Sequence, residues 1–311
     1  MILCIGATPA VQRVMIFCKL VFDAVNRAEQ TFDGAAGKSI NVAKVLQALG
    51  DRPLATGFLG GVLGEQLRAD LRARGIDQDF VSVSAGTRQC ATVIDSFAGT
   101  QTELIEESRP VARADYRKLG DVIGRHVGRC RAVVMSGTIT PGGPEDFYYR
   151  CVRLANRAGA LSVVDARGNL LLKALKAKPG LVKPNRQELA ATVGRSLQSR
   201  KAVMRAVRQL VEQGAGRVVV TAGGESILAF DGRIFWKVVP PRIAVVNPIG
   251  SGDAFAAGLV SGLLRGEDLG QACRWAAAAG AANALTPMPG EVSLADVKRL
   301  ALKVTAERIC G

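Results

Sequence analysis

Short apolar runs alternate with longer amphipathic segments through the second half of the chain. Four of the runs are almost wholly apolar, as strands buried on both faces are, and they occupy residues 132–135, 161–164, 181–182 and 217–220. Because the segments between them have helical spacing, the pattern predicts β-α-β units and a mainly parallel sheet covered by helices on both faces. We therefore expect an α/β fold.

Two segments interrupt this alternation and are expected to pair as antiparallel strands. Residues 11–33 and 88–110 contain β-branched runs with no helical period between them. They predict a small inserted β-sheet, a candidate lid that would exclude water from a site; the alternative is an extension of the main sheet that does not move. The predicted division is a main α/β domain of residues 1–10, 34–87 and 111–311, and a β-sheet lid of residues 11–33 and 88–110.

The segment 247–258, NPIGSGDAFAAG, places a carboxylate directly after a glycine-rich turn at the start of an apolar helix. Gly250 and Gly252 permit turns that other residues resist, and the start of a helix carries a partial positive charge of roughly half a unit. N–H groups at such a turn stabilise an oxyanion or a phosphoryl group. Asp253 is then placed to accept a proton from an attacking hydroxyl. The alternative interpretation is an ordinary helix cap, a role that Ser and Asp both fill well.

Polar or glycine residues follow each predicted strand of the second half. The carboxyl ends of parallel strands line the ligand crevice of an open α/β sheet, so these residues and the Asp253 turn predict one site. The strand ends read Ser136-Gly137, Asp165, Lys183-Pro184-Asn185 and Thr221-Ala222-Gly223-Gly224.

Two glycine-rich segments resemble nucleotide motifs without matching them. Residues 34–39, GAAGKS, resemble the end of a phosphate-binding loop, but Phe32 stands where that motif requires its first glycine. Residues 57–64, GFLGGVLG, lack the GxGxxG spacing of a dinucleotide site. These glycines favour turns and close packing instead.

Charge and composition narrow the class of ligand. Lys and Arg outnumber Asp and Glu by 41 to 27, a net charge of +14 over 311 residues, which favours anionic ligands. The basic residues are spread through predicted helices and aromatic residues make up only 5%, so nucleic acid is not the expected partner. No apolar run reaches the roughly 20 residues that span a bilayer. The start of the chain lacks the basic residues of a signal peptide, and seven scattered cysteines without metal-ligand spacing favour a reducing cytoplasm.

Three motifs together resemble the PfkB (ribokinase-like) sugar kinase family over nearly the whole chain: the turn at 247–258, the segment 36–41 (AGKSIN) and the segment 183–188 (KPNRQE). Residues 25–28 and 136–142 are most similar to its 1-phosphofructokinase and tagatose-6-phosphate kinase branch. The resemblance implies a ribokinase-like three-layer α/β sandwich with a small lid. It also implies transfer of the γ-phosphoryl group of ATP to a sugar hydroxyl with the help of Mg²⁺.

The same resemblance assigns the phosphoryl-transfer residues. Asp253 corresponds to the general base, and Gly250, Ser251 and Gly252 to the anion hole. Glu188 corresponds to the residue that places magnesium, largely through water, although Asn185 and Glu188 also have the spacing of a helix-capping pair. The residues that correspond to the nucleotide site are Lys183, Asn185, Thr221, Gly223, Gly224, Ser226 and Asn283.

On the acceptor side, the lid arginines Arg27 and Arg88 are candidates for a phosphate already on the substrate, because a guanidinium binds phosphate oxygens bidentately. Each is alternatively a surface charge. In this family lids often pair between subunits, so a homodimer through the lid is expected. The full set of expected acceptor-side residues is Gln12, Arg27, Gly37, Lys38, Asn41, Arg88 and Glu103.

The chain departs from the family pattern mainly on the acceptor side. Gln12 stands where the family has an Asp that holds sugar hydroxyls, and it brings no negative charge. Other departures are Ala36, Ser39, Cys90 and Ser226. The favoured acceptor is a sugar phosphate of the fructose 1-phosphate or tagatose 6-phosphate type. The alternatives are an unphosphorylated sugar, a sugar derivative or a nucleoside, and, from another class, a non-catalytic sugar-phosphate sensor or a nucleic-acid-binding protein.

Overall fold

The computed structural model describes residues 1–310 and is built around an eleven-stranded sheet. Most of its parallel strands are apolar runs of the sequence. Three antiparallel strands extend one side of the sheet. The order is β15 (Thr305–Ile309), β14 (Phe235–Val239), β13 (Ile227–Phe230), β12 (Val218–Val220), β11 (Leu181–Val182), β10 (Leu161–Asp165), β9 (Ala132–Ser136), β1 (Ile2–Gly6), β4 (Pro53–Leu59) and β5 (Asp77–Gln78), and β6 (Val81–Ser82) also pairs with β4.

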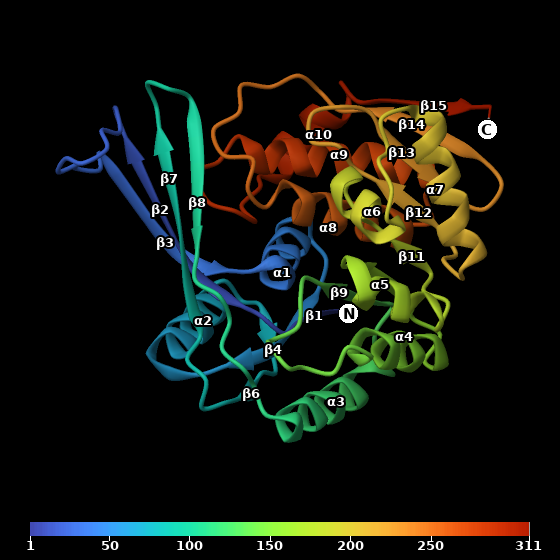
Figure 1. Cartoon of the computed structure of the whole chain (residues 1–311), viewed down its shortest axis with the longest axis horizontal. Helices are drawn as coiled ribbons and strands as arrows, with labels where there is room; N and C mark the ends of the chain where they lie inside the picture. Colours follow the sequence, from blue (N-terminus) through green and yellow to red (C-terminus); the bar gives the residue numbers. More distant parts are fainter. Residues whose placement is uncertain (311) are drawn as a thin grey trace.

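Helices cover both faces of this sheet, and each face has its own apolar core (Figure 1). One core is closed by α1 (Lys38–Ala48), α2 (Gly61–Ala73), α8 (Ser251–Leu264), α9 (Leu269–Ala284) and α10 (Leu294–Ala301). The other is closed by α3 (Arg113–Val127), α4 (Phe147–Arg157), α5 (Gly168–Leu175), α6 (Arg186–Val193) and α7 (Arg200–Glu212). The predicted three-layer α/β architecture is therefore confirmed.

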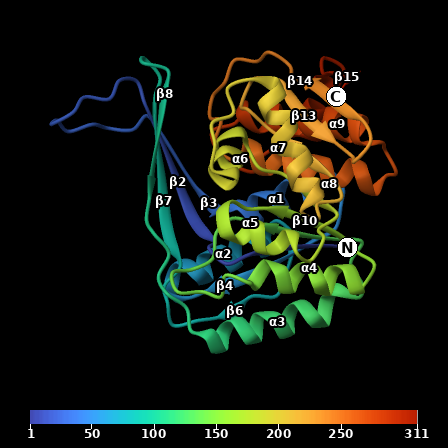
Figure 2. The same ribbon diagram turned by 45° about the vertical axis from the view of Figure 1, so that its right-hand side comes forward.

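A separate four-stranded sheet stands beside the main body (Figures 1 and 2). Its order is β3 (Gln30–Ala36), β2 (Ala10–Phe17), β7 (Arg88–Asp95) and β8 (Thr100–Ile105). These strands fall within a few residues of the two segments expected to form the lid. The central pair, β2 and β7, runs parallel, whereas the sequence favoured antiparallel pairing throughout. The reason is that each segment forms its own hairpin and both hairpins leave the main body in the same direction.

The helix α8 is held against the core by small residues. A Cβ on Gly258 would lie 2.9 Å from the Cα of Ala276 in α9, so the two helices are in backbone contact. Because α8 begins at Ser251, this close packing also fixes the start of the helix against the end of the sheet. Within residues 1–310, no helix is both long enough and apolar enough to cross a membrane.

Candidate active site

A cavity of about 370 Å³ lies between the small sheet and the carboxyl edge of the main sheet. Both sheets contribute walls, so one wall of the cavity comes from the segment expected to act as a lid. Most of the predicted site residues line it: Gln12, Gly37, Lys38, Asn41, Arg88, Glu103, Lys183, Asn185, Glu188, Thr221, Gly250, Gly252 and Asp253.

The turn before α8 provides free N–H groups at the floor of this cavity. Gly250 adopts a left-handed conformation, with φ at 83°, which a glycine tolerates and other residues resist. Within residues 1–310, the backbone N–H groups of Gly250 and Gly252 have no hydrogen-bond acceptor, and both residues face the cavity. The N–H of Ser251 differs because it donates to the Pro248 carbonyl at 3.1 Å. The turn therefore presents two donors of the predicted three.

Asp253 lies in the first turn of α8 and is buried. Its Oδ2 accepts a hydrogen bond of 2.7 Å from Asn41 Nδ2, an atom of α1 that is 212 positions away in sequence. Burial raises the pKa of Asp253 to about 6, an effect that the Lys38 ammonium opposes. A carboxylate with this pKa is ionised at neutral pH and still basic enough to take a proton in the transition state.

Four charged side chains gather beside Asp253 at the ends of β10 and β11 and the start of α1 and α6. The Asp165 carboxylate lies 3.7 Å from Lys38 Nζ and 3.3 Å from Lys183 Nζ, and Lys38 Nζ lies 3.4 Å from Glu188 Oε1. The Asp165 carboxylate holds the pKa of Lys38 above its ordinary value. The charges of two ammonium groups and two carboxylates thus balance one another next to Asp253.

Asn185 and Glu188 form a capping box at the start of α6. Asn185 Oδ1 accepts from the Glu188 N–H at 2.8 Å, and Glu188 Oε2 accepts from the Asn185 N–H at 2.9 Å. The second carboxylate oxygen, Oε1, faces Lys38 and the cavity. The pair therefore has the capping geometry that its spacing allowed, and it keeps one oxygen for the site.

The small sheet supplies one wall of the cavity. Gln12 Nε2 donates to Thr92 Oγ1 at 2.8 Å, and burial raises the pKa of the cavity-lining Glu103. Arg88 donates to the carbonyl oxygens of Thr8 and Glu106, each at 3.2 Å, and its buried Nε has no acceptor within residues 1–310. This wall therefore offers one guanidinium, one carboxyl group and one amide to a ligand.

The start of α1 shows which departures from the family pattern reach the cavity. Gly37 has φ at 101°, and a Cβ there would lie 3.0 Å from Pro9 Cα, so a glycine is required. Ser39 is buried against Gly6 of β1 and points away from the cavity. Cys90 lines the cavity in register with Gln12. The altered positions that line this cavity are thus Gln12, Ala36 and Cys90.

The predicted nucleotide residues spread over three adjoining hollows at the end of β12. Thr221 borders the cavity itself, and Gly223 lines a neighbouring hollow that shares Asn185 and Thr221 with it. Gly224 and Ser226 lie one step further out, in a hollow of about 530 Å³ that α7 and β14 also border. The hollows form a track that leads away from Asp253.

Two predicted residues do not face a ligand as expected. Asn283 is fully buried: its Nδ2 donates to the Ile249 carbonyl at 2.8 Å and its Oδ1 accepts from the Gly290 N–H at 2.7 Å. This side chain supports the turn from behind because all its polar atoms are used, and its expected place in the nucleotide site stays a prediction. Arg27 is exposed in the loop between β2 and β3 and does not line the cavity of its own chain.

A match to a family model covers residues 1–294 and decides the assignment: the model describes the pfkB family of carbohydrate kinases. The chain belongs to this family. It is accordingly a carbohydrate kinase, and carbohydrate kinases of the pfkB family use ATP as the phosphoryl donor. The predicted family membership is confirmed, and with it the kinase class.

Solved structures of phosphofructokinases resemble this pfkB kinase over its full length. A possible 1-phosphofructokinase from Thermotoga maritima is 25% identical with a TM-score of 0.92, and the alignment covers 99% of both chains. Phosphofructokinase-2 from Escherichia coli, solved in complex with fructose-6-phosphate, is 26% identical with a TM-score of 0.86 over 97% of this chain and 98% of that one. A putative phosphofructokinase from Staphylococcus aureus is 29% identical, with a TM-score of 0.82 over all of both chains.

Sequence reasoning placed Asp165 at a strand end that opens onto the predicted site, but it assigned this residue no role. The side chain is 1% exposed, lines the cavity and interacts with both Lys38 and Lys183. The available signal was an Asp at the carboxyl end of an otherwise apolar parallel strand, a position that opens onto the ligand crevice. A buried carboxylate at such a place is a candidate functional group in its own right.

Proposed function

We propose that this pfkB kinase transfers the γ-phosphoryl group of ATP to a hydroxyl of a sugar phosphate, of the fructose 1-phosphate or tagatose 6-phosphate type. The observation that carries the proposal is the placement of Asp253. A carboxylate with a pKa of about 6 lies in the same turn as two free N–H groups, at the floor of a cavity that a second sheet walls on one side. Base, anion hole and enclosure are the three requirements of phosphoryl transfer.

The base has one oxygen available for the acceptor. Asp253 Oδ2 is occupied by Asn41, while Oδ1 has no hydrogen-bond donor within residues 1–310. The acceptor hydroxyl gives its proton to Oδ1, its oxygen forms the new bond to the γ-phosphorus, and the bond from that phosphorus to the β-γ bridging oxygen breaks. The N–H groups of Gly250 and Gly252 stabilise the charge that develops on the transferring group, and ADP leaves with the electron pair.

The charged cluster beside Asp253 suits a nucleotide triphosphate with magnesium. Lys183 and Lys38 face the turn, and the position of a Cβ on Gly252 is 3.9 Å from Lys183 Nζ, so an ammonium lies close to the proposed anion hole. Both buried oxygens of Asp165 lack a hydrogen bond within residues 1–310, and Glu188 Oε1, which lies 3.4 Å from Lys38 Nζ, belongs to a residue that lines the same cavity. Hard oxygen donors of this kind fit Mg²⁺, which would neutralise phosphate charge when bound. The track lined by Thr221, Gly223, Gly224 and Ser226 would take the rest of ATP.

Arg88 supports a phosphorylated acceptor. Its guanidinium lines the cavity with one unpartnered N–H, and Gln12 presents an amide where a sugar hydroxyl would lie. A second candidate acceptor is an unphosphorylated sugar, a sugar derivative or a nucleoside. The observation that favours it is Glu103, whose carboxyl group lies close enough to Arg88 for the two charges to interact, so the net charge of this wall is small.

The exposed apolar residues of the small sheet support a homodimer through the lid. Phe22, Val25 and Phe97 are 89%, 82% and 75% exposed, and they lie in the loops between β2 and β3 and between β7 and β8. Figure 2 shows the small sheet, with these loops at its end, projecting from the main body. Apolar side chains gathered on one projecting element mark a protein interface. Arg27 lies in the same loop as Phe22 and would reach a partner's cavity in such a dimer. The tetrameric inhibited form known for phosphofructokinase-2 from Escherichia coli supports self-association.

The proposal is tested by measuring ATP consumption with phosphorylated and unphosphorylated sugars, sugar derivatives and nucleosides, with and without Mg²⁺. We expect turnover with one or more ketohexose phosphates, and a loss of about 10² to 10⁴ in kcat for Asp253→Asn. Asp268→Asn is the matched control, because Asp268 caps α9 outside the cavity and Asn caps equally well.

The outcomes separate the parts of this proposal. Turnover restricted to unphosphorylated acceptors would support the second candidate. No turnover above the acceptor-free rate on any compound would contradict the kinase mechanism and favour a sugar-phosphate sensor, and binding of nucleic acid instead would favour the remaining alternative. Undiminished activity of Asp253→Asn would remove only the base assignment.

The seven cysteines are free thiols, which supports the predicted cytoplasmic location.

A further inference from the structure

Lys44 is a buried lysine in a helix whose neighbouring residues are also buried. Its side chain is 2% exposed, and its Nζ donates to the carbonyl oxygens of Pro289, at 2.8 Å, and Ala35, at 3.2 Å. The carboxylate of Glu291 is 3.1 Å away. A buried ammonium is costly unless it is paired and hydrogen-bonded, so three oxygen partners at this distance form a specific site for it.

One of these partners lies directly behind the proposed anion hole. A Cβ on Gly250 would lie 2.7 Å from Pro289 Cβ and 3.1 Å from the Gly290 nitrogen, so the segment 286–291 forms the wall against which Gly250 packs. Asn283 connects the same wall to the turn, since it accepts from Gly290 and donates to the Ile249 carbonyl. A movement of Pro289 would therefore move the Gly250 turn with it.

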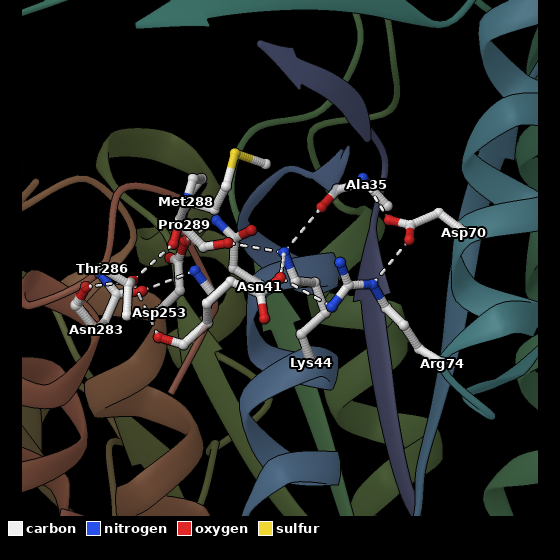
Figure 3. A network of polar contacts seen from close by, with 12 residues as sticks. Ala35, Asn41, Lys44, Asp70, Arg74, Asp253, Asn283, Thr286, Met288 and Pro289 are labelled. Carbon is white, nitrogen blue, oxygen red and sulfur yellow. Dashed lines mark hydrogen bonds and ion pairs between the residues drawn. The ribbon is translucent and has the colours of Figure 1, made fainter. Parts of the chain in front are cut away.

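The other partners connect Lys44 to the small sheet and to α2, as Figure 3 shows. The N–H of Ala35, in β3, donates to Asp70 at 2.7 Å, and Asp70 pairs with Arg74 at 2.9 Å. Arg74 in turn pairs with Glu291 at 2.8 Å, which closes a ring that begins and ends at Lys44. The ring thus joins the base of the lid to the wall behind the phosphoryl-transfer turn.

Lys44 shares its helix with the residue that holds the base. Asn41, which donates to Asp253, lies three residues earlier on α1, and residues at this spacing lie on the same side of a helix. Figure 3 shows both side chains directed toward the 283–291 region and the start of α8. Two contacts therefore fix the position of α1: Asn41 with Asp253, and Lys44 with the Pro289 carbonyl.

We propose that Lys44 is a positioning residue for phosphoryl transfer: its ammonium holds the Pro289 carbonyl and the Ala35 carbonyl, and so fixes the Gly250 turn relative to Asn41 and the lid. The inference rests on the proposed function of that turn, and it adds a residue that touches neither ATP nor the acceptor. A shift of about 1 Å in a reacting group lowers a rate by roughly 10²-fold, so loss of this anchor is expected to act on kcat.

The test compares Lys44→Met with Arg74→Met. Both replace a cation of the ring by a flexible apolar chain, but only Lys44 bonds Pro289, and Glu291 keeps the other cation in either variant. We expect Lys44→Met to lower kcat at least tenfold, with KM for ATP and acceptor changed less than threefold. Arg74→Met is expected to keep at least half of the wild-type kcat. Lys44→Arg, which retains the charge and the N–H donors, is expected to have a kcat at least fivefold higher than that of Lys44→Met.

Hydrogen exchange measures the positioning without any acceptor. Amides of residues 249–254 and 286–291 are expected to exchange several-fold faster in Lys44→Met than in Arg74→Met. Equal exchange in the two variants, equal losses of kcat, or an Arg variant no better than the Met variant would each overturn the proposal. If Lys44→Met does not fold, Lys44→Gln replaces it under the same criteria. A wild-type enzyme inactive on every acceptor would contradict the proposed function, and the exchange data would still decide the role of Lys44.

Discussion

At the scale of single residues, the proposed base is one carboxylate, and its neighbours set its proton affinity. Burial raises the pKa of Asp253 to about 6, the Lys38 ammonium opposes that shift, and the Asp165 carboxylate adds to it. The residue must be ionised to act as a base, so its protonation at low pH removes activity. The charges around Asp253 therefore determine the lower pH limit of the enzyme.

This argument predicts the acid side of the pH profile. As the pH falls through about 6, kcat/KM is expected to fall tenfold per pH unit, because the protonated carboxyl cannot accept the acceptor's proton. In Asp165→Asn the midpoint is expected to move to lower pH, since a negative neighbour that raises the pKa of Asp253 is removed. The measurement is kcat/KM between pH 4.5 and 9 (about two units to either side of neutrality). A midpoint that moves upward in this variant would contradict the assigned electrostatics.

The residues that the sequence identified are those with a distinctive local pattern. Gly250, Gly252 and Asp253 were predictable because a glycine turn, a helix start and an acid coincide within four positions. Asp165 and Lys44 have no such pattern, because each is a single charged residue in an apolar element. Asp165 pairs with Lys38, more than 100 positions away, and Lys44 donates to the backbone carbonyl of Pro289, which no sequence pattern reveals. The supporting contacts of Asn283 were not predictable for the same reason, because one of its partners comes from a distant turn.

At the scale of elements, the sheet and its helices followed from periodicity, while pairings between distant segments did not. The apolar runs at 132–135 and 161–164 appear as β9 and β10 within one residue at each end. The parallel pairing of β2 with β7 was not predicted, because 70 or more residues separate the strands and a β-branched pattern carries no direction. Boundaries between the main domain and the lid stay a prediction.

The α8–α9 contact yields a prediction about stability. A Cβ on Gly258 would lie 2.9 Å from Ala276 Cα and 3.0 Å from Ala279 Cβ, closer than packed carbons approach. Gly258→Ala is therefore expected to reduce the free energy of unfolding by about 1–3 kcal/mol, the usual cost of overpacking. Because α8 begins two residues before Asp253, kcat is expected to fall as well. Urea unfolding and steady-state kinetics measure the two effects.

Gly124→Ala serves as the matched control for Gly258→Ala. Gly124 lies inside α3 on an exposed surface, with no atom within 4 Å of the position that a Cβ would take. The same substitution is expected to stabilise the protein by about 0.5–1 kcal/mol there, because alanine is the better helix former. Equal effects at the two glycines would show that the α8–α9 contact is not tight.

At the scale of the whole molecule, the exposed apolar residues of the lid predict self-association. We expect the wild-type protein to be a dimer at micromolar concentration and the double variant Phe22→Asp/Phe97→Asp to be a monomer. Both aromatic side chains are mostly exposed in one chain, and a carboxylate in a buried interface is strongly unfavourable. Val62→Asp is the control, because Val62 is 85% exposed on α2, away from the lid loops.

Light scattering coupled to size-exclusion chromatography measures this mass directly. A monomeric wild-type protein would contradict the expected dimer. A dimer that survives the double change and dissociates with Val62→Asp would place the interface elsewhere. Activity of the monomeric variant then tests the placement of Arg27. If Arg27 serves a partner's cavity, KM for a phosphorylated acceptor rises on dissociation while KM for ATP does not.

The two walls of the cavity come from elements that the chain can alter independently. Gln12, Cys90 and Glu103 belong to the small sheet, whereas Asp253 and its N–H groups belong to the main body. Mutations on the small sheet can accordingly change which molecule is phosphorylated without disturbing how phosphorylation occurs. In evolutionary terms, the proposed arrangement makes substrate choice and reaction type separate traits, and we expect a library confined to these three positions to change the acceptor while the Gly250–Asp253 turn stays intact.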